Sequence, residues 1–78
     1  MQKLRPDMDI GNAIQKIRIQ NNLTQEQVIA KMQLMGIEVS RSTYAKLETN
    51  RMNIKVSELV ALSKILNVDF NAFFKDLI

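Results

Sequence analysis

Two capped helix starts close together in the chain constrain this sequence more than any other feature. In the first, Thr24 and Gln27 match a capping box, in which the threonine hydroxyl accepts from the Gln27 amide and the glutamine side chain reaches back. Leu23 and Val28 flank this box at the positions of a hydrophobic staple. The second start is Ser40, a favourable N-cap residue. The sequence therefore predicts one helix from Thr24 towards Gly36 and another from Arg41 to about Thr49.

Apolar residues at helical spacing predict three further helices. The first runs from residue 9 or 10 to residue 21, the next covers about residues 56–66, and a short one follows Asp69 over residues 70–77. Because the chain has no alternating run of strand length and no hairpin dipeptide, we expect an all-α fold, a compact bundle of about five helices. We expect residues 1–8 to form an extended arm and residues 9–78 to form the single domain.

Composition argues against several classes of function. The chain of 78 residues has no Cys and no His, which removes thiolate ligands, the commonest metal ligand and the usual general base. Its carboxylates are scattered and no Gly-rich phosphate loop occurs, so we expect no enzyme, metal, cofactor or small-molecule site. No apolar stretch of about 18 residues is present, so we expect no membrane span and a cytoplasmic location.

Positive charge concentrates in one segment. The chain has a net charge of +3. Residues 40–55 contain one acidic residue, Glu48, and four basic residues, Arg41, Lys46, Arg51 and Lys55. Such a cluster is compatible with a solvated face, but here it begins a short helix with Arg, Ser and Thr. Short polar and basic side chains at a helix start suit the major groove of double-stranded DNA, and Arg41 would pair with guanine.

These residues resemble the Cro-like, phage-repressor type of helix-turn-helix proteins, the XRE family, over about residues 10–74. The motifs that carry the resemblance are Leu23-Thr24-Gln25, Ser40-Arg41-Ser42-Thr43 and Leu47-Glu48, with a matching helix on each side. The resemblance implies a lambda-repressor-like domain whose helix from Arg41 is the recognition helix. It further implies a sequence-specific DNA-binding transcriptional regulator, expected to be a repressor of bacterial or phage type that binds a short operator.

The resemblance also implies roles for individual residues. Base contacts fall to Arg41, Ser42 and Lys46, and phosphate contacts to Gln25, Thr43, Asn50 and Arg51. Two alternatives stay open: Lys46 suits phosphate at least as well as a base, and Asn50 suits a purely conformational role at the helix end. Tyr44 stands where the family has an aliphatic residue. Its spacing from Leu47 predicts that its ring packs inside, and we expect its hydroxyl to reach phosphate or water. Arg18 and Glu48 match a structural pair that ties the first helix to the recognition helix.

Three expectations concern the rest of the chain. The C-terminal residues Phe70, Phe74, Leu77 and Ile78 offer more apolar surface than one small core needs, which favours a homodimer contact. Gln25 and Ser40 lie 15 positions apart, about five more than is usual in the family, so we expect a longer second helix and a larger turn. The alternative function is a protein-interaction or antitoxin-like module that uses the same fold.

Overall fold

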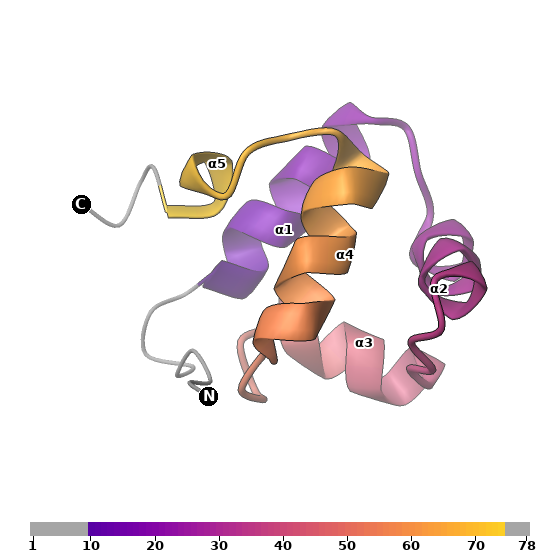
Figure 1. Cartoon of the computed structure of the whole chain (residues 1–78). Helices are drawn as coiled ribbons and strands as arrows, with labels where there is room; N and C mark the ends of the chain where they lie inside the picture. Colours follow the sequence, from indigo (N-terminus) through magenta and orange to yellow (C-terminus); the bar gives the residue numbers. More distant parts are fainter. Residues whose placement is uncertain (1–9, 75–78) are drawn as a thin grey trace.

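The computed structural model describes residues 10–74, and this part of the chain forms five helices and no strand (Figure 1). The helices are α1 (Ile10–Gln20), α2 (Gln25–Leu34), α3 (Arg41–Glu48), α4 (Val56–Leu66) and α5 (Asn71–Phe74). The prediction of an all-α bundle is therefore confirmed. The expected arm of residues 1–8 and the expected dimer residues Leu77 and Ile78 lie outside the described residues.

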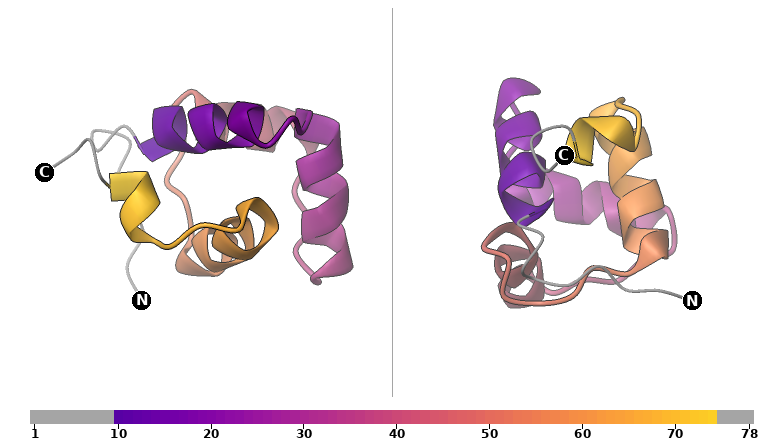
Figure 2. Two further views of the ribbon diagram at one scale, coloured as in Figure 1. Left: turned by 90° about the horizontal axis from the view of Figure 1, so that it is seen from above. Right: turned by 90° about the vertical axis from the view of Figure 1, so that its left-hand side faces the viewer.

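The helices enclose one core. In Figure 1, α1 and α4 cross the middle of the molecule, and α3 lies below them. The helices α2 and α5 lie on opposite sides of this central pair (Figure 1, Figure 2). Direct packing joins α3 to both α1 and α2, and α2 to α4. Because α3 packs against two helices on its inner side, only its outer side is free to face another molecule.

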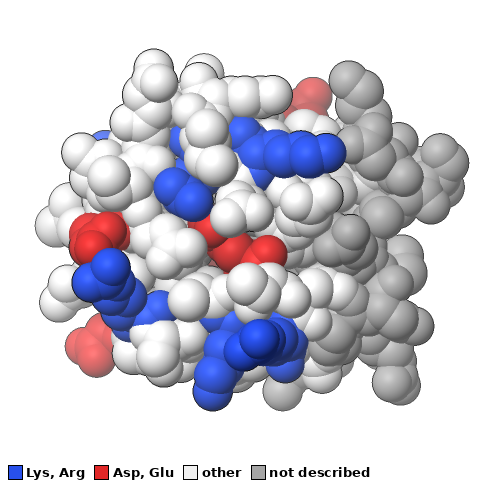
Figure 3. Space-filling model, turned by 180° about the vertical axis from the view of Figure 1, so that it is seen from behind, with Lys and Arg blue, Asp and Glu red and all other residues white. Residues whose placement is uncertain are grey.

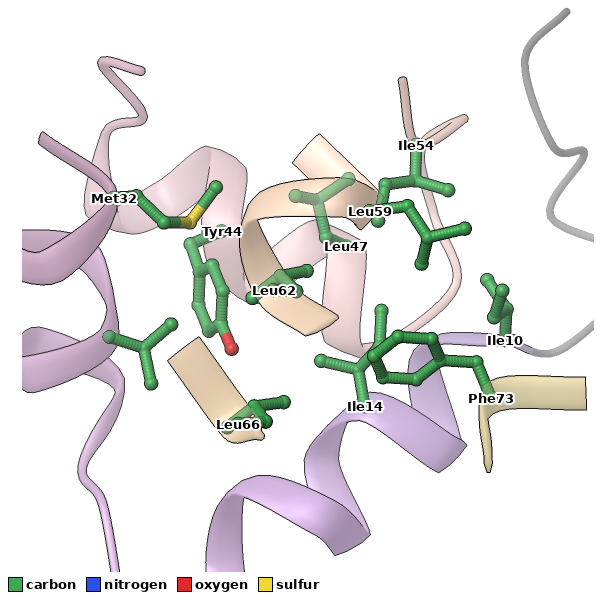
Figure 4. Packing of buried hydrophobic residues seen from close by; sticks show 11 residues of the cluster. Ile10, Ile14, Met32, Tyr44, Leu47, Ile54, Leu59, Leu62, Leu66 and Phe73 are labelled. Carbon is green, nitrogen blue, oxygen red and sulfur yellow. The ribbon is translucent and has the colours of Figure 1, made fainter. Parts of the chain in front are cut away.

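The core contains apolar side chains from all five helices (Figure 4). Its largest fully buried members are Ile14, Val28, Met32, Tyr44, Leu62, Leu66 and Phe73. The removal of these side chains from water supplies the main driving force for folding. In Figure 4 the ring of Tyr44 points from α3 towards Leu62 and Leu66, so this residue belongs to the core.

A close approach between α1 and α3 requires glycine at position 11. A Cβ atom there would lie 2.8 Å from the carbonyl oxygen of Glu48 and nearer still to that of Leu47. Real side chains do not tolerate such contacts with a backbone oxygen, so only glycine lets the two helices meet.

Local capping fixes the two helix starts that the sequence predicts. The Gln27 amide donates to Thr24 Oγ1 (3.1 Å), and the Thr24 amide donates to Gln27 Oε1 (2.8 Å). The Thr43 amide likewise donates to Ser40 Oγ (3.1 Å). After α2, Gly36 adopts a φ of +84°, a conformation that glycine reaches without strain. The longer spacing of the chain is therefore accommodated by a ten-residue α2 and the connection over residues 35–40.

Candidate nucleic-acid interface

The sequence of α3 divides the helix into an inner and an outer side. Tyr44, Leu47 and Glu48 are buried, whereas Arg41, Ser42 and Lys46 are exposed. The buried residues lie three and four positions apart, the spacing that puts side chains on one face of a helix. Ser42 and Lys46, four positions apart, therefore share the opposite face, and Arg41 is exposed at the first position of the helix.

Positive charge surrounds this outer side. The four basic residues of the segment, Arg41, Lys46, Arg51 and Lys55, are all exposed. In the view of Figure 3, blue side chains gather along the lower edge of the molecule, the edge at which α3 lies in Figure 1. A surface of this kind attracts the phosphate backbone of a nucleic acid.

One acidic residue lies directly beside the basic surface. Glu26 Oε2 lies 2.9 Å from Arg41 Nη2 in an ion pair, and the two side chains are 57% and 73% exposed. An exposed pair of this kind contributes about 0–1 kcal/mol to folding. The sequence analysis missed it, because residues 26 and 41 meet only when the turn brings the first turns of α2 and α3 together.

A buried polar network holds α3 against the other helices. Arg18 Nε and Nη2 donate to the two carboxylate oxygens of Glu48 at 2.6 and 3.1 Å, and Arg18 Nη1 donates to the carbonyl of Leu23 at 2.8 Å. The hydrogen bond to Glu48 raises the pKa of Arg18 above its ordinary value, despite the opposing effect of burial. The two residues that the family resemblance pairs therefore lie together, between α1 and α3.

Gln25 joins the same network. Its side-chain Nε2 donates to Glu48 Oε1 at 3.0 Å, a contact between the first residue of α2 and the last of α3. An amide group carries two N–H donors, so one remains for a phosphate oxygen. The network thus fixes the start of α2 relative to α3, which sequence reasoning did not anticipate.

Asn50 and Arg51 follow the end of α3. Asn50 has a φ of +62°, the left-handed conformation that asparagine tolerates, and its Oδ1 accepts from the Gly11 amide at 3.5 Å. The conformational role of Asn50 is thus visible in the structure. Arg51 is exposed, and Thr43 on α3 is half-buried.

The predicted phosphate contact of Tyr44 is wrong. Its side chain is completely buried, and its hydroxyl oxygen makes no hydrogen bond with the described residues. The reason is helical spacing, since Tyr44 lies three positions before Leu47 and shares its inward face. Burial raises the pKa of Tyr44 well above its ordinary value, because the phenolate would be charged in an apolar interior.

The remaining expectations concern the C-terminal helix and other ligands. Phe70 is 44% exposed and Phe74 is half-buried, while Phe73 fills the core. Within residues 10–74, His, Cys, Asp and Glu side chains do not gather into a group able to hold a metal ion. None of the helices in that range has the length and apolar character needed to cross a membrane.

Comparison with known proteins agrees with this geometry. The sequence profile of a helix-turn-helix family matches residues 14–73, from within α1 to within α5, and so covers all of α2 and α3. Neither the curated proteins nor the solved structures provide a match. The matched range covers most of the chain and contains the outward-facing α3. The chain therefore belongs to the helix-turn-helix family of Cro- and lambda-repressor-like DNA-binding regulators.

Proposed function

We propose that this protein is a sequence-specific transcriptional repressor that inserts α3 into the major groove of a short operator. The observation that carries the proposal is the outward side of α3, which exposes Arg41, Ser42 and Lys46 while the opposite side is buried in the core. A regulator that occupies an operator blocks the access of polymerase to the same DNA. The protein would therefore act on the DNA of the cell or phage that carries the operator.

Base reading falls to the exposed side chains at the start of α3. The guanidinium of Arg41 matches the O6 and N7 acceptors of guanine, a contact that discriminates between bases by about 1–3 kcal/mol. Ser42 has a short hydroxyl that donates or accepts, so it adapts to more than one base. Lys46 carries a compact charge on a flexible stem and serves either a base or a phosphate.

Phosphate contacts surround the base-reading side chains and position the helix. We assign them to Gln25, Thr43, Asn50 and Arg51. The first amides of α2 add to this set, because the N-terminus of a helix favours an anion. These contacts contribute affinity for any duplex and carry no sequence information directly.

The experiment that tests the proposal is the selection of bound sites from random duplex DNA. The wild-type protein is expected to enrich one short motif. Arg41→Ala is expected to lose the preference at one base pair, whereas Arg51→Ala, the matched removal of a positive charge, weakens all duplexes similarly. If Arg41→Ala lowers affinity without any change of preference, the assignment of base reading to Arg41 is wrong.

A second candidate function is a protein-interaction or antitoxin-like module in which DNA contact is minor. The observation that favours it is an apolar surface away from α3, where Leu34 is 88% exposed and Met35 is 42% exposed. Leu34, Met35 and Ile65 line a pocket of about 340 Å³ together with Lys31 and Lys64. The salt dependence of DNA binding separates the two functions, because contacts to several phosphates weaken steeply as salt rises, whereas a minor DNA contact does not.

We also propose that two copies bind one operator through the C-terminal end of the chain. The exposed ring of Phe70 and the half-buried Phe74 support this contact, to which the sequence analysis adds Leu77 and Ile78. A two-fold dimer would put two recognition helices about 34 Å apart, one turn of DNA. Sedimentation of the free protein and of its DNA complex tests the idea, and a monomer in both at high micromolar concentration would exclude it.

A further inference from the structure

The ion pair between Glu26 and Arg41 connects the two helices of the helix-turn-helix unit on the protein surface. Glu26 lies in the first turn of α2, Arg41 is the first residue of α3, and Glu26 Oε2 lies 2.9 Å from Arg41 Nη2. From this contact we infer that Glu26 is a positioning and specificity-determining residue for base reading. The inference rests on the proposed function, because it requires that Arg41 reads a base.

The geometry of the pair leaves Arg41 able to bind guanine. A guanidinium group carries five N–H donors in one plane, and the ion pair with Glu26 engages its Nη2 group. A bidentate contact with the O6 and N7 atoms of guanine needs two of the others. With its side chain 73% exposed, an unpaired Arg41 would sample many orientations, so the carboxylate restricts the guanidinium before DNA arrives.

The same carboxylate opposes binding to DNA in general. Glu26 is 57% exposed and lies beside the basic surface that faces the phosphates, so its charge repels every duplex to a similar extent. Only a site at which guanine binds the restrained guanidinium of Arg41 offsets this repulsion. A carboxylate also accepts a hydrogen bond from the amino group of cytosine, the partner of guanine in the base pair. Glu26 therefore lowers affinity for all sequences and raises the preference for a G·C pair.

Four variants of the full chain test this role: Glu26→Gln, Arg41→Ala, the double variant and Glu38→Gln. Glu38 is a matched control, because it is exposed, lies in the connection between α2 and α3, and takes no part in the two ion pairs of the described residues. Titrations use two probes, the operator selected by the wild-type protein and the same duplex with the G·C pair assigned to Arg41 replaced by A·T. Thermal unfolding of each variant is measured in parallel.

Glu26→Gln is expected to bind both duplexes more tightly and to discriminate between them less, by a factor on the order of two to ten. Arg41→Ala and the double variant are expected to discriminate equally little, and Glu38→Gln is expected to discriminate as the wild type does. A merely structural pair would lower thermal stability and leave the ratio of the two affinities unchanged. If Glu26→Gln keeps the wild-type ratio while Arg41→Ala loses it, the inference fails and the proposed function stands. If Arg41→Ala also keeps the ratio, or no motif is selected, the proposed function fails and the inference with it.

Discussion

Removal of the Glu48 carboxylate should reveal how strongly α3 is held in the fold. This carboxylate accepts three hydrogen bonds, two from Arg18 and one from Gln25, and its side chain is completely buried. In Glu48→Ala the guanidinium of Arg18, itself 10% exposed, would keep the Leu23 carbonyl and lose its countercharge. The perturbation therefore leaves a charge in the interior without its partner.

The expected loss follows from this uncompensated charge. Breaking a buried ion pair by removing one partner costs about 3–5 kcal/mol. Because Arg18 keeps its hydrogen bond to the Leu23 carbonyl, we expect Glu48→Ala to lose about 3 kcal/mol of folding stability, the lower end of this range. For a domain of this size each kcal/mol shifts the melting temperature by about 4–8 °C, so the expected decrease is roughly 12–24 °C.

Thermal and urea unfolding followed by circular dichroism measure this loss. Glu38→Ala is the matched control, because Glu38 is exposed and its removal is expected to change the free energy of unfolding by less than about 0.5 kcal/mol. The urea dependence of the unfolding free energy should be the same in all variants, which shows that the same transition is compared.

Two results would refute the reasoning. A loss of well under about 1 kcal/mol in Glu48→Ala would show that the pair is not a buried tie. The double variant Arg18→Met, Glu48→Leu removes both charges and is expected to recover most of the lost stability, since an apolar pair of similar size often replaces a buried ion pair without loss. If the double variant is as unstable as Glu48→Ala, the loss of stability arises from packing and not from the unpaired charge.

Three further predictions concern α1 and Tyr44. Gly11→Ala should destabilise by about 1–3 kcal/mol in thermal unfolding, because its Cβ meets the backbone of α3, whereas Asn12→Ala on the exposed side should not. Tyr44→Phe should keep both DNA affinity and folding stability in binding and urea titrations, because the buried hydroxyl has no partner to lose. Above pH 10.0, the ordinary pKa of tyrosine, only the unfolded chain should release the Tyr44 proton. Stability should then fall by up to about 1.4 kcal/mol per pH unit in melts of the wild type, and less in Tyr44→Phe.

The parts of the fold that the sequence predicts well are those with local causes. The start of α2 depends on Thr24 and Gln27, three positions apart, and the start of α3 depends on Ser40 and Thr43. Such contacts form within one turn, so the residues that make them are adjacent in the printed chain. The range expected for the fourth helix likewise matches α4, because its apolar periodicity is local.

The parts that the sequence does not predict depend on distant residues. Gln25 reaches Glu48 across 23 positions, and Glu26 meets Arg41 only through the turn between α2 and α3. No spacing rule identifies such pairs before the helices are packed. Tyr44 is a different case, because its spacing from Leu47 already indicated the core. Its phenolic hydroxyl suggested a contact with phosphate or water, but the hydroxyl lies in the packed interior and makes no hydrogen bond with the described residues.

The two ion pairs of α3 use similar chemistry and have different consequences because of burial. At its C-terminal end, the buried pair of Glu48 with Arg18 fixes the helix in the fold, and its loss lowers the population of folded protein. At its N-terminal end, the exposed pair of Arg41 with Glu26 contributes little to folding, and its proposed effect is on the choice of base. A change at Glu48 should therefore weaken binding to all duplexes by the same factor, whereas a change at Glu26 should reduce the ratio of their affinities. The ratio of affinities for two duplexes thus separates the role of holding the helix from that of reading DNA.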